Sequence, residues 1–462
     1  MRRDRLLEPQ RIGVVGGGPA GAICAIQLRR LAAARGRDVE VLVFDRKDFH
    51  VAGPRHCNMC AGIISDGLIR KLEGIGIRVP RDAVQRSIQS YTLVVPGAAV
   101  RLQRPMGSRI YTAFRSGGPL CLVAGQRRGL DEFLLQTAEQ SGVIHLPRLV
   151  REVRLPAVRD GPVVLVDSEG DEHPMDAVVG AFGVNSSTAA LFEALGFGYR
   201  RPRTARAAQC EVPYDALEAD GAWADDVKVL SLGIPGVAIA ALVPKTSHIT
   251  VSLIGRDVRE EHLERFLGHK EVRALLDQGH ATSRRCCLCR PRLPVGAGRN
   301  VVADRVVMIG DAHTSRYLKN GLDSAFVTAS LAAEALLSGG ASRANLMAGY
   351  VDPCRALFYR DNKWGWLMLA GHHAQGRVPW LARAQIDAAQ RELAGSRRPR
   401  LNSALWGLLT GDEPYRDLFR RALHPRVSFE IGRSVGRAVL RRRGPQWPAG
   451  VAPEGLGGES ER

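Results

Sequence analysis

Residues 10–45 read QRIGVVGGGPAGAICAIQLRRLAAARGRDVEVLVFD, and this stretch decides the fold class. It opens with an apolar run typical of a buried strand, continues with apolar residues at helical spacing, and closes with a second apolar run. A strand, a turn, a helix and a second strand within about 35 residues form the repeating unit of α/β proteins. We therefore expect a Rossmann-like nucleotide-binding fold that begins here.

The turn of this unit contains the pattern Gly16-x-Gly18-x-x-Gly21. The first glycine permits a tight turn, the second lets the backbone approach a pyrophosphate, and the third lets the helix pack against the strand. The N-terminus of the helix then directs its positive dipole end at the phosphates. In this turn, the candidate contacts to a dinucleotide are Gly16, Gly18, Pro19, Ala20 and Gly21.

The second predicted strand ends in Asp45, where an acidic side chain can hold the ribose hydroxyls of a dinucleotide. The neighbouring Arg46 is a further candidate contact. These features predict a bound dinucleotide, and the choice between NAD and FAD depends on a segment much further along the chain.

That segment, RVVMIGDAHTSRYLKNGLDSAFVTA, places a strand before Gly310 and Asp311 and starts a helix near Gly321. It resembles the second FAD motif of the glutathione-reductase-type flavoproteins. The resemblance implies that Asp311 binds a ribitol hydroxyl and that the helix N-terminus faces the flavin pyrimidine. A helix dipole aimed at that part of the ring stabilises the anionic reduced flavin. The implied contacts to FAD are Gly310, Asp311, Asn320, Gly321 and Leu322.

Two further segments resemble the hydroxybenzoate-hydroxylase-like branch of these flavoproteins. GQRRGLDEFLLQTAEQSG resembles its arginine-containing helix, which makes Arg127 a candidate FAD contact. MDAVVGAFGVNSS resembles its Asp-Gly segment, but Phe182 stands at the usual Asp position while Gly183 and Ser186 remain. NAD(P)H is a candidate electron donor, and the departure at Phe182 weakens the carry-over of that segment's role in nicotinamide binding.

Within the branch, the chain resembles the geranylgeranyl reductase family over roughly residues 10–345. PGVAIAALVPKTSHITVSLIG resembles the family's substrate-sheet segment, with Pro244 and Lys245 at matching positions. The family's aromatic positions are occupied here by Ile239, Ala241 and Val243. CAGIIS also resembles the family's cysteine-containing loop near the flavin.

The expected architecture is a Rossmann-like FAD-binding domain, a substrate domain with an antiparallel sheet, and a helical C-terminal extension. The FAD-binding domain is expected to be discontinuous. The predicted boundaries are 9–85, 126–200 and 296–345 for the FAD-binding domain, 86–125 and 201–295 for the substrate domain, 346–440 for the helical region, and 441–462 for a disordered tail.

The cysteines allow three interpretations. Cys57-x-x-Cys60 and the segment with Cys286, Cys287 and Cys289 offer two short-spaced pairs of thiols. Cys57, Cys60, Cys287 and Cys289 could form a tetrahedral site for zinc or an iron–sulfur cluster. Alternatively, arginine-activated thiolates could exchange electrons with flavin as a redox dithiol. The third interpretation is that these cysteines are buried or unrelated; the remaining four, Cys24, Cys121, Cys210 and Cys354, are expected to pack in the core.

The catalytic residues are not identified by any motif, and the candidates are Cys57, Cys60, His56 and Lys319. His56 lies in the cysteine-containing loop and could act as an acid or base, although a solvated loop histidine is the stronger interpretation for it and for His50. A cation at Lys319 would favour reduced flavin if it lay near flavin N1. His313 is either a cofactor contact or a structural hydrogen-bonding residue.

The chain of 462 residues carries a formal net charge of +18, which favours anionic partners such as phosphorylated substrates, a dinucleotide or an acidic membrane face. No aromatic and basic reading surface is evident, so nucleic acid is not expected. No stretch reaches the ~18–20 uninterrupted apolar residues of a membrane span. We expect a cytoplasmic protein without a signal peptide. DNKWGWLMLAGHHAQGRVPWLARAQ, which mixes Trp with basic residues, suggests either peripheral contact with the inner membrane face or a helical cap on the substrate domain.

These observations predict an FAD-dependent oxidoreductase. The favoured reaction is a reductase or dehydrogenase that transfers hydride between flavin and an apolar substrate, such as a prenyl-type or polyketide-like molecule. The alternatives are an aromatic-type flavin monooxygenase and an electron-transfer flavoprotein with a cysteine-ligated metal centre. A non-enzymatic FAD-binding scaffold is the least favoured.

Overall fold

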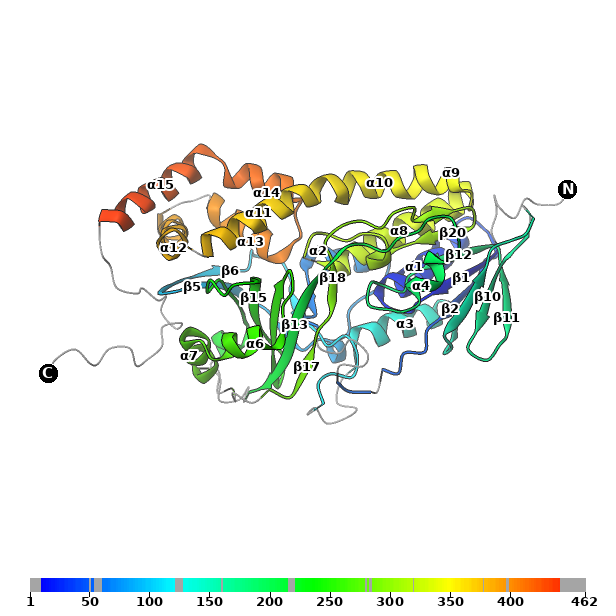
Figure 1. The fold of residues 1–462 in the computed structure, drawn as a ribbon, viewed down its shortest axis with the longest axis horizontal. Helices are drawn as coiled ribbons and strands as arrows, with labels where there is room; N and C mark the ends of the chain where they lie inside the picture. The colour runs from blue at the N-terminus through cyan, green and yellow to red at the C-terminus, as the bar shows by residue number, and fades with distance from the viewer. Residues whose placement is uncertain are drawn as a thin grey trace.

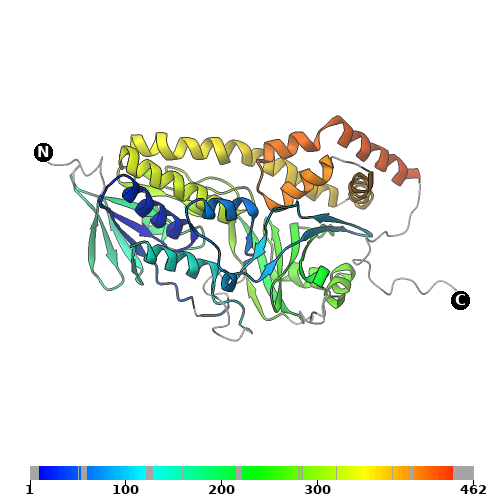
Figure 2. The ribbon, with the colours of Figure 1, turned by 180° about the vertical axis from the view of Figure 1, so that it is seen from behind.

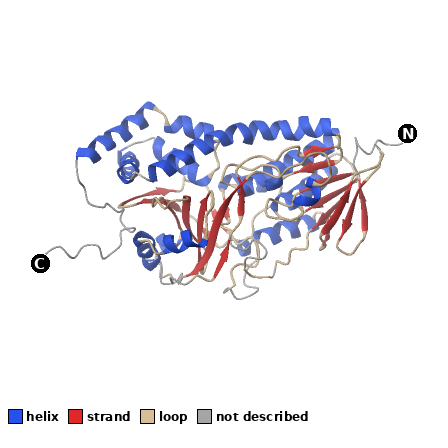
Figure 3. Ribbon diagram, viewed as in Figure 1, coloured by secondary structure: helices blue, strands red, loops and turns tan. Residues whose placement is uncertain are grey.

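The computed structural model has two large sheets side by side, with helices along one long edge of the molecule (Figure 1). Strands and helices are mixed throughout, as the α/β prediction requires (Figure 3). The structure describes residues 10–49, 51–53, 60–120, 128–158, 161–214, 221–278, 281, 285–318, 320–376, 378–395 and 399–440. The predicted disordered tail, 441–462, lies outside the described residues.

The N-terminal stretch supplies β1 and β2 of the first sheet, in the predicted strand–helix–strand order. Five of its strands are parallel and the edge strand β19 is antiparallel. The order is β19 (Val302–Ala303), β20 (Val306–Met308), β12 (Ala177–Gly180), β1 (Arg11–Val15), β2 (Glu40–Phe44), β8 (Ile144–Leu146). Parallel strands are usually buried on both faces, which explains the continuous apolar runs of β1 and β2.

Three main helices pack with this sheet. Helix α1 (Pro19–Ala34) lies between α3 (Leu130–Gln140) and α8 (Gly321–Gly339), as the view from behind shows (Figure 2). The shorter helices α2 (Asp66–Glu73) and α4 (Ala189–Glu193) lie in the connections. A separate antiparallel sheet is formed by β9 (Val150–Arg154), β10 (Val163–Asp167) and β11 (Glu172–Met175).

The second large sheet is antiparallel except where β14 pairs in parallel with β5. Its order is β17 (Cys287–Cys289), β13 (Thr204–Pro213), β16 (His248–Gly255), β15 (Val237–Pro244), β14 (Asp226–Leu230), β5 (Ser90–Val95), β6 (Ala98–Gln103), with β18 (Arg292–Pro294) also paired to β13. A small sheet is formed by β3 (Ile63–Ile64), β7 (Tyr111–Thr112) and β4 (Arg86–Ser87). The short segments in the connections are η2 (Arg81–Ala83), α5 (Gly221–Ala224) and η3 (Gly310–Ala312).

The two faces of the second sheet carry separate apolar cores. One core includes Leu263 and Phe266 of α6 (Glu260–Leu267) and Leu275 of α7 (Lys270–Gln278). The other core includes Leu369, Ile386 and Leu405 from the C-terminal helices, packed against β5, β6, β14 and β15. The C-terminal helices therefore cover one face of the second large sheet.

A continuous helical rod runs from Arg343 to Gly376 along the edge of the molecule and reaches from the first sheet to the second (Figure 1). It consists of α9 (Arg343–Leu346), the π-helical η4 (Met347–Val351), α10 (Asp352–Cys354), the π-helical η5 (Arg355–Tyr359) and α11 (Arg360–Gly376). The remaining helices are α12 (Pro379–Gly395), α13 (Arg400–Thr410), α14 (Tyr415–Ala422) and α15 (Pro425–Leu440). None of the helices in the described part of the chain is both long and apolar enough to cross a lipid bilayer.

Candidate FAD site

Two of the three glycines in the Gly16-x-Gly18-x-x-Gly21 motif have no room for a side chain. Gly16 has φ +111°, and a Cβ on it would lie 2.7 Å from the Ala181 carbonyl oxygen. A Cβ on Gly21 would lie 1.8 Å from the Gly16 carbonyl oxygen. The first glycine is thus needed for the turn and the third for the close start of α1, which agrees with the physical reasons behind the motif.

The middle glycine of the motif faces open space. A Cβ on Gly18 would meet nothing within 4 Å, and the same holds for Gly321 at the start of α8. Helix α1 has no side-chain cap at Gly18 and begins with Pro19. The N-termini of α1 and α8 therefore have space beside them for an anionic or electron-rich group. The diphosphate and the flavin ring of FAD are such groups.

Asp45 follows β2 and lies beside the glycine-rich turn. Its carboxylate accepts hydrogen bonds from the backbone N–H groups of Gly17, at 2.6 Å, and Lys47, at 2.8 Å. Each carboxylate oxygen has a second lone pair, so the half-buried side chain can still accept from a ribose hydroxyl. Arg46, the neighbouring candidate, is exposed.

The second motif lies directly against the first. Gly310 has φ +59°, and a Cβ on it would lie 2.7 Å from the Ala20 side chain in α1. Its N–H donates to the Thr328 hydroxyl in α8 at 3.0 Å. The fold therefore brings Gly310 and Asp311 to the N-terminal end of α1, although the two motifs are far apart in the sequence.

Asp311 is the polar side chain of this second motif. Burial raises the pKa of its carboxyl group, and the nearby Arg115 together with a hydrogen bond from Ser315 opposes that rise. A carboxyl group in this position is suited to accept a hydrogen bond from a hydroxyl such as that of ribitol.

The start of α8 is shaped by Asn320, which has φ +50° and accepts a hydrogen bond from the Asp323 N–H at 3.4 Å. Asp323 in turn pairs with Lys71 of α2. Gly321 is exposed and Leu322 packs partly buried against the first core. Two predicted contacts at this site, Lys319 and Arg127, lie outside the described residues.

Sequence reasoning missed a buried polar cluster next to these motifs. Asp131, at the start of α3, is 1% exposed and accepts hydrogen bonds from Arg115 and, at 2.8 Å, from Lys47. Burial raises the pKa of Asp131, but the two cations outweigh burial and lower it. The cluster joins the loop after β2 to α3, and its only sequence signal is that Asp131 lies in the segment that resembles the arginine-containing helix.

A second missed cluster centres on Glu211, which pairs with Lys245 at 3.5 Å. Both side chains are fully buried, and the Thr250 hydroxyl donates to Glu211 at 2.8 Å. The Lys245 ammonium lies 4.4 Å from the centre of the Phe114 ring and donates to the Cys60 carbonyl oxygen at 2.8 Å. Burial raises the pKa of Glu211, and Lys245 opposes that rise.

The two cysteine segments approach each other around this pair. Lys245 contacts Cys60, and Cys287 lies opposite Glu211 in the pairing of β17 with β13. Burial raises the pKa of the Cys287 thiol, which disfavours the thiolate that the dithiol interpretation requires. Cys286 is disulfide-bonded, whereas the thiols of Cys60, Cys287 and Cys289 are not in disulfides.

The metal interpretation gains no support from the described part of the chain. There, no group of three or more His, Cys, Asp or Glu side chains could hold a metal ion. The candidate Cys57 and the candidates His50 and His56 lie outside the described residues, so the catalytic role of that loop stays a prediction. Cys24, Cys210 and Cys354 are buried, as their packing role predicts, and Cys121 is not described.

His313 follows η3 and is structural. It is fully buried, with Nδ1 2.7 Å from the Tyr350 hydroxyl and Nε2 2.7 Å from the Tyr359 hydroxyl. Burial lowers its pKa to about 3, with Arg355 as a further cause, so the ring is neutral at pH 7. Tyr350 donates to the Met308 carbonyl, so it accepts from Nδ1–H, and Tyr359 donates to Nε2.

Phe182 also has a packing role. Its ring lies 4.8 Å from that of Phe192 and 6.3 Å from that of Tyr199, beside the first core. An aromatic side chain therefore fills the position where the resembled branch carries Asp.

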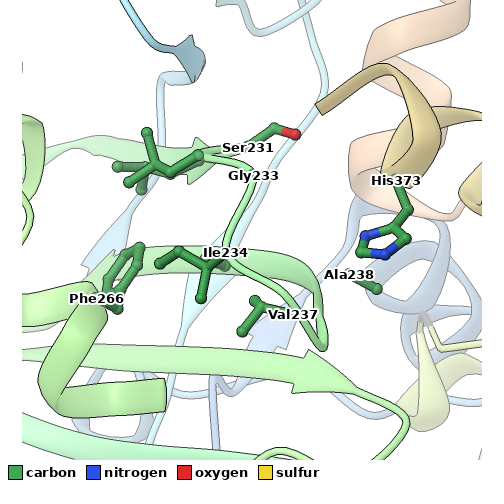
Figure 4. Close-up of a pocket in the computed structure, with 10 residues that line it drawn as sticks. Ser231, Gly233, Ile234, Val237, Ala238, Phe266 and His373 are labelled. Atoms are coloured by element: carbon green, nitrogen blue, oxygen red, sulfur yellow. The ribbon is translucent and has the colours of Figure 1, made fainter. Parts of the chain in front are cut away.

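A separate pocket lies at the end of β15 that is remote from Lys245 (Figure 4). Ile234 and Val237 line it together with Phe266 of α6, and His373 of α11 faces it from the other side. No residue predicted to bind FAD lines this pocket, so we do not assign it to the cofactor.

Comparison with known proteins shows which folds and sequences the chain resembles. No protein-family model matches it. The fold is similar to that of a geranylgeranyl bacteriochlorophyll reductase-like protein from Thermoplasma acidophilum, with a TM-score of 0.65 at 16% identity over 89% of this chain and 98% of that one. It is also similar to 2-methyl-3-hydroxypyridine-5-carboxylic acid oxygenase, with a TM-score of 0.57 at 18% identity over 80% of this chain and 93% of that one. The chain therefore shares its fold with a reductase-like protein and an oxygenase, which agrees with the fold predicted for an oxidoreductase.

The sequence relatives are more specific. The chain is 26% identical to the chloroplastic geranylgeranyl diphosphate reductase of Arabidopsis thaliana over 200 residues, which is 41% of this chain and 37% of the relative. It is 24% identical to the rice protein of the same name over 351 residues, or 72% of this chain and 67% of the relative. The predicted resemblance to geranylgeranyl reductases is confirmed. The match spans little more than a third of the Arabidopsis relative's length.

Proposed function

We propose that this chain binds FAD between the N-termini of α1 and α8 and catalyses hydride transfer between the flavin and an apolar substrate. The contact of Gly310 with Ala20 is the observation that carries the proposal, because it joins the two motifs into one cradle. Open space beside Gly18 and Gly321 leaves room for the cofactor at both helix ends.

Bound FAD would supply two-electron oxidation–reduction chemistry, and the residues of the chain would position it. The backbone of α1 would bind the pyrophosphate, with Asp45 on the adenosine ribose and Asp311 on the ribitol. The N-terminus of α8 would direct its dipole at the flavin pyrimidine. Arg127 and Arg46 remain candidate contacts to FAD, and Lys319 a candidate cation near flavin N1.

An apolar substrate is supported by partly buried apolar side chains that pack against the same core as the turn before α8. Tyr317 and Leu318 in that turn are partly buried, as are Ala61, Ala241 of β15 and Trp406 of α13, and all pack against the same apolar core. A prenyl-type or polyketide-like molecule has the chemistry to bind such side chains. Ile239, Ala241 and Val243 replace the aromatic residues of the resembled family, so the shape of the site would differ from that family's.

The Gly18→Ala variant tests the cofactor site. Gly18 has φ −66° and space around it, so the added methyl group leaves the apoprotein folded but occupies the expected path of the pyrophosphate. We expect FAD affinity, measured by flavin fluorescence quenching, to fall at least about tenfold. Gly371→Ala is the matched control, because a Cβ there also meets nothing within 4 Å. Unchanged FAD affinity in Gly18→Ala would contradict the proposed site.

The second candidate reaction is an aromatic-type monooxygenase, since the chain shares its fold with an oxygenase. An oxygen electrode separates the two candidates. NAD(P)H-driven oxygen consumption coupled stoichiometrically to product would favour the monooxygenase, whereas anaerobic substrate turnover would favour the reductase. An absorbance beyond the flavin bands would favour the third candidate, an electron-transfer flavoprotein with a cysteine-ligated iron–sulfur cluster. Zinc has no visible absorbance and no redox chemistry, so metal analysis would be needed to detect it.

We also propose peripheral contact with an anionic membrane through the C-terminal helices. Trp366 on α11 is 58% exposed near the exposed Lys363, and Phe429 on α15 is 67% exposed near the exposed Arg426. Exposed aromatic side chains among cations suit an anionic lipid surface. Trp364 of the same segment packs against Phe419 instead.

Vesicle co-sedimentation tests this contact. Binding should increase with the fraction of anionic lipid, decrease with salt, and weaken in Trp366→Ala. Met106→Ala is the control, because Met106 is an exposed apolar side chain far from these helices in the chain. Equal binding to neutral and anionic vesicles would contradict the charge argument.

A further inference from the structure

The turn that precedes α8 has an unfavourable backbone conformation. Leu318 has φ +56° and Asn320 has φ +50°, both in the left-handed region. Asparagine tolerates this region, but leucine does so only at a cost. Such residues persist where their surroundings hold them, and they are common at ligand sites. This turn, of which the structure describes residues 315–318 and Asn320, therefore needs support from the elements packed against it.

The first support comes from Asn362 on α11. Its side-chain Nδ2 donates to the Ser315 carbonyl oxygen at 2.8 Å, and its Oδ1 accepts from the Tyr317 N–H at 2.9 Å. A single amide thus bridges two backbone groups of the turn. Because one group donates and the other accepts, the amide has only one orientation that satisfies both.

The second support comes from Tyr415, the first residue of α14. Its hydroxyl donates to the Tyr317 carbonyl oxygen at 2.7 Å, and the residue is fully buried. The backbone N–H of Tyr415 donates to Asp361 on α11 at 2.9 Å, which links the two helices. The ring packs directly on α11, where a Cβ on Gly365 would lie 2.6 Å from it.

The connection between α13 and α14 adds further contacts. Arg316 in the turn donates to the carbonyl oxygens of Gly411, at 2.7 Å, and Glu413. The Asn320 amide lies 3.3 Å from both the Gly411 carbonyl oxygen and the Asp412 carboxylate. Residues of the C-terminal helices and of the connection between α13 and α14 thus contact the turn at both of its ends and in its middle.

From this geometry, we infer that Asn362 and Tyr415 are positioning residues of the flavin site. They hold the Ser315–Asn320 turn so that the N-terminus of α8 faces the cofactor. The inference rests on the proposed FAD site and assigns to the C-terminal helices a role beyond that of covering the second large sheet. Neither residue is expected to touch a reacting atom.

Two variants test the inference. Tyr415→Phe removes one hydrogen bond and keeps the ring, and Asn362→Ala removes two hydrogen bonds. We expect FAD affinity to fall about threefold to tenfold in the first variant and about tenfold or more in the second. The flavin midpoint potential should become more negative in both, because a displaced helix dipole stabilises reduced flavin less. Fluorescence quenching and dye-equilibrated reduction measure the two quantities.

Asn345→Ala is the matched control. Asn345 on α9 also holds backbone groups, donating to the carbonyl oxygens of Ala335 and Gly340, but it does so at the C-terminal end of α8. The control should lose stability in urea denaturation while keeping FAD affinity and potential within about twofold of wild type.

Three outcomes would overturn the inference. Wild-type affinity and potential in folded Tyr415→Phe and Asn362→Ala would show that the supports do not act on the flavin. Equal weakening of FAD in Asn345→Ala would show a general loss of stability. Absence of FAD binding by the wild-type chain would reject the proposed function itself, and the positioning role with it. Should Asn362→Ala fail to fold, Tyr415→Phe still decides, since it changes a single hydroxyl.

Discussion

Several buried polar side chains connect segments that are far apart in the chain. Lys245 joins Glu211 on β13 to the Cys60 carbonyl, and His313 joins the second FAD motif to the π-helical segments. Each group is satisfied by hydrogen bonds or an ion pair, which is what makes its burial tolerable. Removing one partner therefore costs more than the interaction contributes.

Lys245→Met should destabilise the protein by about 3–5 kcal/mol at pH 7, because it leaves the buried Glu211 carboxylate without its cation. The double variant Glu211→Leu with Lys245→Met removes both charges and should recover most of that loss. Urea denaturation of the two variants and the wild type measures the difference. A double variant as unstable as Lys245→Met would contradict the ion-pair argument.

His313 should make the protein sensitive to acid. Its folded-state pKa is about 3 against an ordinary value of 6.5, so between these values the unfolded chain binds a proton that the folded chain does not. Stability should thus be lost as pH falls from about 6.5 toward 3, by about 1.4 kcal/mol per pH unit from this group. In His313→Gln, the free energy of unfolding should depend less steeply on pH, by about one proton's contribution of 1.4 kcal/mol per pH unit. Urea denaturation between pH 7 and pH 5 measures this dependence. Equal slopes would contradict the assignment of a buried neutral ring.

At the predicted FAD site, η3 and the glycine-rich turn pack closely against the start of α1. The contact of η3 with α1 depends on the absence of a side chain at Gly310, and the start of α1 depends on the same absence at Gly21. The glycine pattern of the first turn is local, so its geometry could be predicted from the sequence. The positive φ at Gly310 and its contact with Ala20 could not, because they depend on the packing of two distant segments.

Gly310→Ala should cost about 2–4 kcal/mol and weaken FAD binding, since the new methyl group meets Ala20 in a backbone conformation with φ +59°. Gly170→Ala separates the two causes. Gly170 has φ +91°, but a Cβ there meets nothing within 4 Å, so only the backbone term applies. Equal losses of stability in the two variants, measured by denaturation, would show that the contact with Ala20 contributes nothing.

Part of the molecule's architecture could be predicted from the sequence, and part could not. The α/β class, the first sheet and the two FAD-type motifs follow from apolar periodicity and glycine spacing, which are local signals. The roles of Asn362 and Tyr415 do not, because a hydrogen bond across 45 or 98 positions leaves no pattern in one sequence. The domain boundaries and the roles of Arg127, Lys319, His56 and Cys57 stay predictions.

The molecule should unfold as one unit, because the helical rod and the helices after it contact the first core and one core of the second sheet. FAD at about 100 times its Kd should stabilise that unit by about 2.7 kcal/mol. Differential scanning calorimetry should show a single transition that moves upward with FAD. Two transitions, of which only one responds to FAD, would contradict this coupling.

The length of the rod from Arg343 to Gly376 also determines the direction in which the Asn362 side chain leaves the helix axis. Each residue of an α-helix turns the next side chain by about 100°, and a π-helical turn accommodates one extra residue within a helix. The rod contains two such turns, η4 and η5, before it reaches Asn362. Deleting one residue from either would leave the helix continuous yet rotate Asn362 away from Ser315. The number of residues in this rod, as much as their identity, thus determines which side chain meets the turn.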